Sequence, residues 1–294
     1  MVFPMSNTAV QSILLFVLHV FVLSARGHGG NEQEENPKLI IVSFDGFRWD
    51  YLSRTNTPNF DRIVHKGVRA RYGLKNAFIT NTLPNHFTLA TGLYEETHGI
   101  VGNVMYDPVL KEMFNVRNRS QMASSRWFDV GAEPIWVTNQ LQKTNGRSGC
   151  MQWIGCEALI KGVAPTRHVP YIADMKNETR IDETIGWFTG PYPVNLGLIY
   201  FQEPDETAHD FGPDSPQVTA MIGGLDKVVG HLLDRLEATD LLEHTNIIIT
   251  SDHGFAATGP DRVVNLDNYI TPDSYRIFSD TPVAAVLPND GNSC

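Results

Sequence analysis

Carboxylate and imidazole side chains lie directly after three apolar runs of the sequence. They are Asp45, Asp205, His209, Asp252 and His253. Aspartate and histidine supply ligands that suit zinc, with no cysteine needed. Asp205 and His209 are four residues apart, so one helical turn would place both on one face. Asp252 and His253 are adjacent and must splay from a loop to share an ion. These residue types therefore indicate a metal site.

Thr82 follows a fourth apolar run and is a candidate nucleophile. A threonine hydroxyl is a poor nucleophile at its free pKa, and metal coordination would deprotonate it. Two metal ions a few ångströms apart can hold both the attacking and the leaving oxygen of a phosphoryl transfer. Pro84 and the apolar residues after it predict that a helix begins near Thr82. The positive end of that helix would favour an anion there.

The apolar runs are typical of buried parallel strands, because they are continuous and rich in Ile and Val. The predicted strands are residues 38–44 (KLIIVSF), 195–202 (NLGLIYFQ) and 246–251 (NIIITS), with 77–80 (AFIT) and 282–287 (PVAAVL) as further candidates. Apolar residues recur every three or four positions within 216–242, which predicts a helix. Strands that alternate with helices predict an α/β fold with a mostly parallel sheet. Ligands bind at the carboxyl ends of strands in such sheets, so the side chains above are expected to meet at one edge.

Longer motifs around these residues resemble the ectonucleotide pyrophosphatase/phosphodiesterase family of the alkaline phosphatase superfamily. They are LIIVSFDGFRWDYL, FITNTLPNHFTLATGLYEETHGIVGNVMYDP, EPIWVTNQ, NLGLIYFQEPDETAHDFGPDSP and IIITSDHG, in that order. The chain is most similar to the short fourth and fifth members, over residues 38–288. The resemblance implies an alkaline-phosphatase-like α/β fold, with a mostly parallel sheet that is flanked by helices and incomplete at the carboxy terminus.

The resemblance also implies a catalytic site with two zinc ions. In that family a threonine attacks phosphorus, a nucleotidyl-enzyme forms, and water then releases a nucleoside monophosphate. Carried over residue by residue, the first zinc is held by Asp45, Thr82, Asp252 and His253, and the second by Asp205 and His209. Three further histidines, His86, His98 and His168, are interpreted as orienting or surface residues.

Three further residues are expected to bind the substrate. Asn103 matches the family's asparagine that supports a non-bridging phosphate oxygen, together with a backbone N–H near Thr82. Tyr171 looks like the aromatic residue that stacks on the nucleobase, and Trp153 is expected to line the same pocket. Ordinary packing is the alternative for both aromatic residues.

The sequence departs from the family pattern at several positions. The family's third ligand to the second zinc is a later histidine, and no histidine follows His253. The expectation is a truncated phosphodiesterase domain with an incomplete second zinc site, since catalytic zinc usually has three protein ligands. Four residues differ from the one that is usual in the family: Asn81 stands in place of lysine, Leu83 of an aromatic residue, Ile154 of proline and Phe255 of methionine. These changes spare the ligands and affect substrate preference.

Composition narrows the class of partner. The formal net charge is −10 and 42% of the residues are hydrophobic, which argues against a protein that binds nucleic-acid polymers. The expected substrate is a small nucleotide, such as NAD, a dinucleoside polyphosphate or a nucleoside triphosphate, with choline phosphodiesters as a less favoured option. The rivals are a phosphomonoesterase or sulfatase, and a catalytically impaired secreted or surface binding protein. The sulfatase motif C/S-x-P-x-R is not found.

The amino-terminal residues indicate an extracellular location. The apolar run 13–23 (ILLFVLHVFVL) is followed by small residues, which predicts a signal peptide over 1–27 and a polar linker over 28–37. An uncleaved signal anchor is the alternative.

Asn118 and Asn177 begin N-x-S/T acceptors for glycosylation. Cys150 and Cys156 can pair across a short loop in an oxidising compartment, which leaves Cys294 over. Residues 289–294 form a divergent tail, without the carboxy-terminal membrane anchor of close relatives; after signal removal no membrane span is expected.

Overall fold

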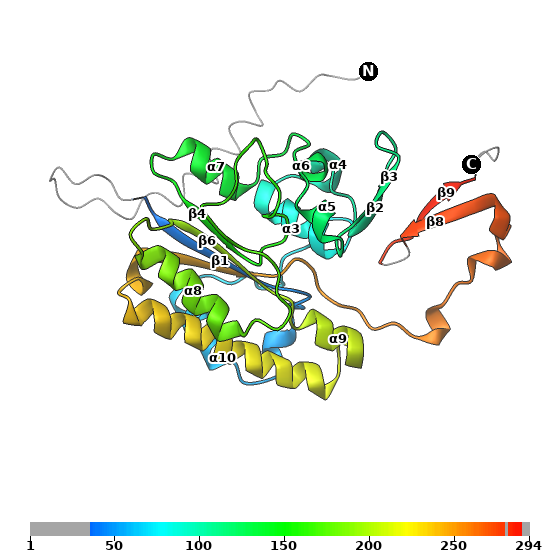
Figure 1. The fold of residues 1–294 in the computed structure, drawn as a ribbon. Helices are drawn as coiled ribbons and strands as arrows, with labels where there is room; N and C mark the ends of the chain where they lie inside the picture. The colour runs from blue at the N-terminus through cyan, green and yellow to red at the C-terminus, as the bar shows by residue number, and fades with distance from the viewer. Residues whose placement is uncertain (1–35, 280–281, 290–294) are drawn as a thin grey trace, which may run out of the picture. The chain divides into compact units, whose positions relative to one another are not determined.

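A five-stranded parallel sheet, in the order β5-β4-β6-β1-β7, forms the centre of the fold. The computed structural model describes residues 36–279 and 282–289. The strands are β1 (Lys38–Phe44), β4 (Ser148–Met151), β5 (Arg167–Val169), β6 (Leu196–Phe201) and β7 (Thr245–Thr250). The predicted fold class, an α/β protein with a mostly parallel sheet flanked by helices, is confirmed (Figure 1).

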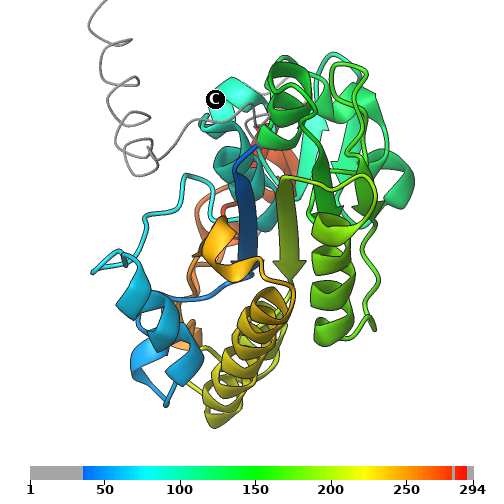
Figure 2. The ribbon, with the colours of Figure 1, turned by 90° about the vertical axis from the view of Figure 1, so that its left-hand side faces the viewer.

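The central strand β6 is buried along its whole length. Its side chains alternate between two cores, with Ile199 and Phe201 in one and Leu198 and Tyr200 in the other. Every residue of a strand that is covered on both faces must be apolar or hydrogen-bonded, which explains the unbroken run in the sequence. Figure 2 shows β1 and β6 side by side, with their carboxyl ends at the same edge.

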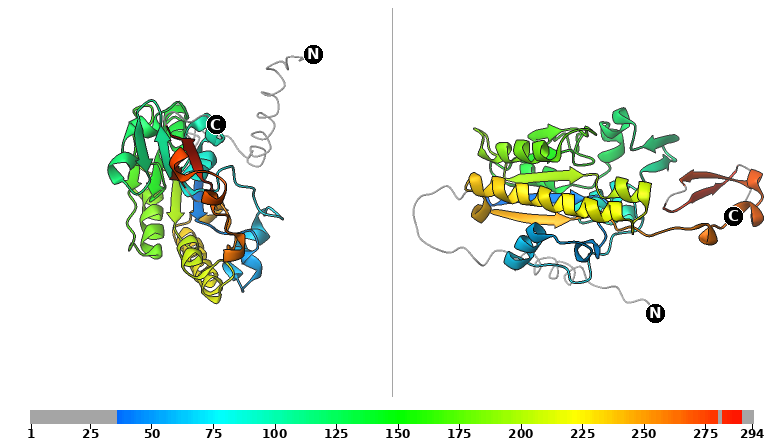
Figure 3. Two further views of the ribbon diagram at one scale, coloured as in Figure 1. Left: turned by 90° about the vertical axis from the view of Figure 1, so that its right-hand side faces the viewer. Right: turned by 90° about the horizontal axis from the view of Figure 1, so that it is seen from below.

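One face of the sheet is covered by α2 (Pro58–Lys66), α8 (Asn177–Thr189) and α10 (Pro216–Ala238). The helix predicted within 216–242 is therefore confirmed. It begins at Ser215, whose hydroxyl accepts the N–H of Val218 at 3.2 Å, as an N-cap residue does. Its apolar stripe faces the sheet, and α10 runs lengthwise along it in Figures 1 and 3.

The other face is covered by shorter elements. They are α3 (Thr82–Thr91), α4 (Glu95–His98), α5 (Arg119–Met122), α6 (Ser125–Phe128), α7 (Ile135–Gln142), and the antiparallel pair β2 (Val104–Asp107) and β3 (Glu112–Asn115). An aromatic cluster fills the space beneath them: the ring of Phe87 lies 5.5 Å from that of Phe128 and 6.1 Å from that of Trp136. Aromatic pairs at such distances stabilise a core beyond the area that they bury.

Residues 282–287 do not form a buried parallel strand. The structure instead has the antiparallel pair β8 (Tyr275–Ser279) and β9 (Ala285–Pro288), separate from the main sheet. Val286 and Leu287 are 39% and 40% exposed, so this apolar run does not correspond to a buried strand. The pair contacts β2 through Phe278, whose ring stacks on Tyr106 at 5.1 Å. Short 3-10 turns at Tyr51–Ser53, Leu242–His244, Pro260–Arg262, Leu266–Asn268 and Pro272–Ser274 complete the described elements.

Residues 77–80 form a loop, and the predicted strand there is wrong. The buried side chain of Asn85 supplies the hydrogen bonds that a neighbouring strand would supply: its Oδ1 accepts the N–H of Ala77 at 2.9 Å and its Nδ2 donates to the carbonyl of Ile79 at 2.7 Å. The side chain of Phe78 is 75% exposed. Because the Asn85 side chain forms these hydrogen bonds, the backbone groups of this loop do not need to pair with another strand.

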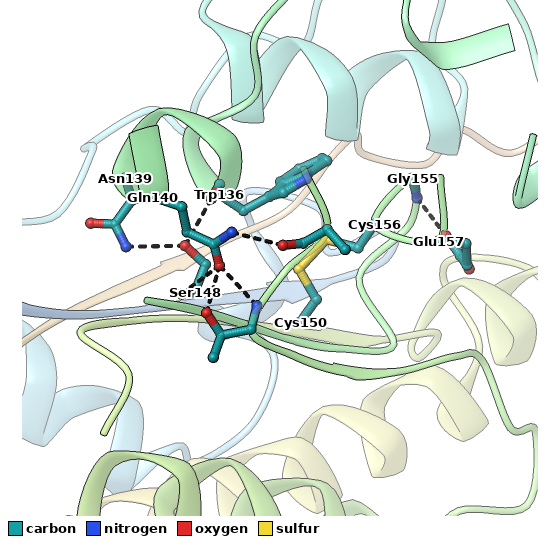
Figure 4. Close-up of a disulfide and its surroundings, with 10 residues drawn as sticks. Trp136, Asn139, Gln140, Ser148, Cys150, Gly155, Cys156 and Glu157 are labelled. Carbon is teal, nitrogen blue, oxygen red and sulfur yellow. Dashed lines mark hydrogen bonds between the residues drawn. A yellow bond between two sulfur atoms is a disulfide. The ribbon is translucent and has the colours of Figure 1, made fainter. Parts of the chain in front are cut away.

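Two strands of the sheet, β4 and β5, were not predicted, because they are short and lack a run of β-branched residues. A disulfide between Cys150 and Cys156 closes the turn after β4, so the pairing that the sequence permitted is present (Figure 4). Cys294, the signal peptide, most of the linker and nearly all of the tail lie outside the described residues. None of the helices that the structure describes is long and apolar enough to cross a membrane.

Candidate active site

The carboxyl ends of β1, β6 and β7 bring the predicted metal ligands to one edge of the sheet. Asp45 directly follows β1, and its N–H donates to the carbonyl of Phe201 at the end of β6 at 2.9 Å. Asp205 is the first residue of α9 (Asp205–Phe211), and its N–H donates to the carbonyl of Asp45 at 3.1 Å. The predicted meeting of three strand ends is therefore present, whereas Thr82 arrives from a loop and not from a strand.

Gly46 contacts the segments that follow β6 and β7, and glycine is the residue type that fits this position. Its φ of +65° is left-handed, where side chains are strained. Its N–H donates to Oδ1 of Asp252 at 3.1 Å. A Cβ atom at this position would lie 2.9 Å from Oδ1 of Asp205, so the missing side chain lets Asp205 approach.

Asp45, Asp252 and His253 form a group that can hold a metal ion. One ligand atom from each lies within 4.8 Å of the others, and Nε2 of His253 lies 3.4 Å from both Oδ1 of Asp45 and Oδ2 of Asp252. Nδ1 of His253 lies 2.9 Å from the carbonyl oxygen of Gly254. A carbonyl only accepts, so Nδ1 carries the proton and Nε2 faces the two carboxylates, as in a metal-ligating histidine.

The carboxylates of Asp45 and Asp252 are buried and that of Asp205 is partly buried, and each has an oxygen without a hydrogen bond. Oδ1 of Asp45, Oδ1 of Asp205 and Oδ2 of Asp252 have no hydrogen-bond partner. Burial, and then the neighbouring carboxylate, raise the pKa of Asp45 to about 8 and that of Asp205 to about 7. Burial also raises the pKa of Asp252. Unpaired buried carboxylates are costly unless a proton or a cation neutralises them, so this donor set fits a divalent cation such as zinc.

Asp205 and His209 form the second predicted pair, one turn apart on α9. Nε2 of His209 lies 3.4 Å from Oδ2 of Asp205, and the His209 side chain is 67% exposed. The ring of Phe255 packs edge-on against His209 at 4.8 Å. The structure thus brings together the two residues predicted for the second zinc. They lie next to the first group, because the N–H of Asp205 donates to the carbonyl of Asp45.

His86 connects Thr82 to the metal group. Its Nδ1 donates to the carbonyl of Thr82 at 2.7 Å, and its Nε2 accepts the hydroxyl of Ser43 at 2.9 Å. Oδ2 of Asp252 lies 3.5 Å from the same Nδ1. Burial lowers the pKa of His86 to about 4, so it is neutral at physiological pH. It is buried and not a surface residue, and it lies four positions after Thr82, which is the first residue of α3.

Asn103 lies beside Thr82, as the resemblance implied. Its Oδ1 accepts the N–H of Leu83 at 2.8 Å. Its own N–H donates to Oδ1 of Asn81 at 2.7 Å. Because Oδ1 already accepts a hydrogen bond, the Nδ2 amide is the end of the Asn103 side chain that is left to donate to another group.

The aromatic candidates lie near this site but differ in their surroundings. Trp153 is buried, and its ring lies edge-on 5.1 Å from His86. Tyr171 is half-buried; its ring lies 6.5 Å from that of Tyr200, and the guanidinium of Arg119 lies 5.1 Å from its centre. A role in binding a base stays a prediction for both.

Tyr200 was not predicted as a residue of the site. Its hydroxyl donates to Oδ2 of Asp45 at 2.5 Å. The alternation along β6 can identify it, because Tyr is the one polar-tipped residue in an otherwise apolar strand and such a tip needs a partner when buried.

The glycosylation acceptors lie at the beginnings of helices. Asn118 is exposed and precedes α5, and its Oδ1 accepts the hydroxyl of Ser120 at 2.7 Å. Asn177 is the first residue of α8. Modification of either residue stays a prediction.

Comparison with known proteins identifies the class that this fold and site define. Residues 39–293 match the family model described as Type I phosphodiesterase / nucleotide pyrophosphatase. The chain belongs to that family, and the resemblance seen in its motifs is confirmed.

The relatives include human ectonucleotide pyrophosphatase/phosphodiesterase family member 5, which is 41% identical over 278 residues, or 94% of this chain and 57% of the human protein. A Xenopus laevis protein named bis(5'-adenosyl)-triphosphatase enpp4 is 41% identical over 254 residues, or 86% of this chain and 54% of that protein. The chain therefore spans little more than half the length of these curated relatives.

Solved structures of the murine member 5 have the same fold. One is an inactive form, in which alanine replaces a threonine, in complex with AMP. It superposes with a TM-score of 0.82 at 42% identity, over 87% of this chain and 67% of that one.

Proposed function

We propose that this chain carries the catalytic centre of a zinc-dependent hydrolase that cleaves phosphodiester or pyrophosphate bonds in extracellular nucleotides, such as NAD or dinucleoside polyphosphates. The observation that supports this most is the group of buried carboxylates with unpaired oxygens beside the first turn of α3. The name of the frog relative and the AMP bound to the murine relative support a nucleotide as substrate.

The proposed ligands follow the geometry of the site. Asp45, Asp252 and His253, with Thr82, would hold one zinc, and Asp205 and His209 would bind a second. Bound zinc would lower the pKa of the threonine hydroxyl and neutralise charge on the phosphate.

Thr82 is the proposed nucleophile. Its Oγ forms a bond to phosphorus as the bond from phosphorus to the leaving group breaks, which leaves the nucleotidyl group on Thr82. Water then breaks the bond to Thr82 and releases a nucleoside monophosphate. Because Asn103 occupies the N–H of Leu83, the donors for the non-bridging oxygens are Nδ2 of Asn103 and the N–H of Thr82.

Replacement of the nucleophile tests this proposal. Thr82→Ala should abolish turnover of a nitrophenyl nucleotide diester, because no other hydroxyl takes its place, and should keep the melting temperature and most of the zinc. Thr91→Ala, at the other end of α3, is the matched control and should retain turnover. Loss in the control, or retention of more than a few per cent of activity in Thr82→Ala, would overturn the assignment.

A second candidate is a binding protein with impaired turnover. It is favoured by the second pair, which offers two ligands within the described residues, one of them the exposed His209. Measurement of the zinc content and of diester hydrolysis distinguishes the two candidates. The enzyme should bind two zinc ions and hydrolyse diesters. The binding protein should hold about one zinc ion and bind AMP without hydrolysing diesters.

Secretion belongs to the same proposal. Residues 1–27 would be the signal peptide, and Asn118 and Asn177 would carry glycans. The word ectonucleotide in the name of the human relative supports this location.

A further inference from the structure

The side chains of Asn81 and Asn103 exchange roles around Thr82. Asn81 occupies the N-cap position of α3, where an asparagine oxygen usually accepts an N–H of the first helical turn. Here its side chain makes no such hydrogen bond. Instead, Oδ1 of Asn103 accepts the N–H of Leu83 at 2.8 Å, and Oδ1 of Asn81 accepts the N–H of Asn103 at 2.7 Å.

This exchange holds Asn103 at three points. Its N–H and its side-chain oxygen are bound by the residues on either side of Thr82, and its carbonyl accepts the N–H of Val116 at 2.8 Å. The Nδ2 amide is the polar group of Asn103 left without a hydrogen bond to the described residues. The nucleophile and the amide donor are thus fixed relative to each other by two short hydrogen bonds.

Asn81 is itself held by hydrogen bonds from Asn85. Its carbonyl accepts the N–H of Asn85 at 3.2 Å and Nδ2 of Asn85 at 3.0 Å. Asn85 is 2% exposed and also binds Ala77 and Ile79. The acceptor that Asn81 presents to Asn103 is therefore fixed in place, which is what a positioning residue requires.

We propose that Asn81 is a positioning residue that sets the place of the Asn103 amide relative to Thr82. The inference rests on the proposed function, in which that amide binds a phosphate oxygen in the transition state. Without the acceptor on Asn81 the Asn103 backbone loses one of its three hydrogen bonds and can shift. Misplacement of a catalytic group by about 1 Å can cost about a hundredfold in rate.

A double-mutant cycle tests the inference in the zinc-loaded full chain. Asn81→Leu keeps the approximate shape and removes the acceptor, so kcat should fall about tenfold to a hundredfold while KM changes little. In the Asn103→Ala background the same substitution should cost nothing further, because its effect passes through Asn103. Asn76→Leu removes another asparagine of this loop, one that binds Ala77 and Thr80, and should leave kcat near the parent value.

Hydrogen exchange of the Asn103 amide gives a second readout that does not depend on turnover. It should be slow in the parent and in Asn81→Asp, which keeps an acceptor oxygen, and faster in Asn81→Leu. An unchanged kcat in Asn81→Leu, or a loss that adds in full to that of Asn103→Ala, would overturn the positioning role. Parent turnover in Asn103→Ala would instead overturn the donor role of Asn103, and this inference with it.

Discussion

At the scale of single residues, each carboxylate of the metal group has one oxygen held by the protein and one left unpaired. Oδ2 of Asp45 accepts the hydroxyl of Tyr200, and Oδ1 of Asp252 accepts the N–H groups of Gly46 and His253. The other oxygens, Oδ1 of Asp45 and Oδ2 of Asp252, accept no hydrogen bond. Each carboxylate is therefore oriented to offer a single oxygen to a cation, and its protein donor decides which oxygen that is.

Tyr200→Phe should weaken zinc binding by about tenfold to a hundredfold, the usual cost of losing an outer partner of a metal ligand. The phenol donates the hydrogen bond that orients Asp45, and phenylalanine keeps the ring in the core. Competition of the protein with a zinc-sensitive dye measures the change. Tyr192→Phe, at a tyrosine that is 65% exposed, is the control; equal zinc affinity in parent and Tyr200→Phe would contradict the role assigned to Tyr200.

The sequence motifs predicted the residues that meet at the candidate metal site, but not the residues that orient them. Asp205 and His209 were placed on one helical face by their spacing alone, and the structure agrees. The alternation along β6 marks Tyr200 as a buried residue that needs a partner, but the partner, Asp45, lies 155 residues away and is not revealed by that pattern. The contact of Gly46 with Asp252 spans 206 residues. Such contacts depend on the strand order of the sheet, which the sequence did not determine.

At the scale of elements, the prediction succeeded for one helix and three strands and failed for two other apolar runs. The helix α10 and the strands β1, β6 and β7 have strong patterns, and only their ends differ by a few residues from prediction. Residues 77–80 and 282–287 have the same composition as strands. In the first segment the side chain of Asn85 binds the backbone, and in the second the partner is β8. A short apolar run cannot reveal its hydrogen-bond partner.

The disulfide after β4 is expected to stabilise the turn that carries Trp153. Cys150 and Cys156 are six residues apart, and both are buried. Closing so short a loop reduces the entropy of the unfolded chain, which corresponds to about 2 kcal/mol of stability. The double substitution Cys150→Ser and Cys156→Ser should lower the free energy of unfolding by at least that amount, since buried hydroxyls add a cost.

Urea unfolding of the parent and the double variant measures the difference. Reduction of the parent with a thiol reagent is the matched control, because it breaks the bond and adds no hydroxyl. Equal unfolding midpoints for the oxidised parent, the reduced parent and the variant would show that the bond contributes nothing to stability.

At the scale of the whole molecule, the acidic site is expected to couple metal binding to folding. In the absence of metal, Asp45 with a pKa of about 8 and Asp205 with a pKa of about 7 hold protons in the folded state at a pH where the unfolded carboxyls, near 3.8, have lost them. Folding stability therefore falls as the pH rises toward the folded pKa values. His86 has the opposite effect at lower pH, because burial lowers its pKa from 6.5 to about 4.

Between pH 6.5 and pH 8 His86 is neutral in the folded state, and the raised pKa of His253 causes a loss of stability in the same direction as the raised pKa values of Asp45 and Asp205. The melting temperature of the chelator-treated chain should fall across this interval by a few degrees, the shift expected when about 1 kcal/mol is lost from a domain of this size. Zinc replaces the protons on the same oxygens, so its addition should raise the melting temperature more at pH 8 than at pH 6.5. Asp45→Asn, which cannot ionise at this position, should show a weaker dependence on pH and a smaller response to zinc. A melting temperature of the metal-free parent that rises from pH 6.5 to pH 8 would show that these carboxylates are already ionised and stabilised without a cation.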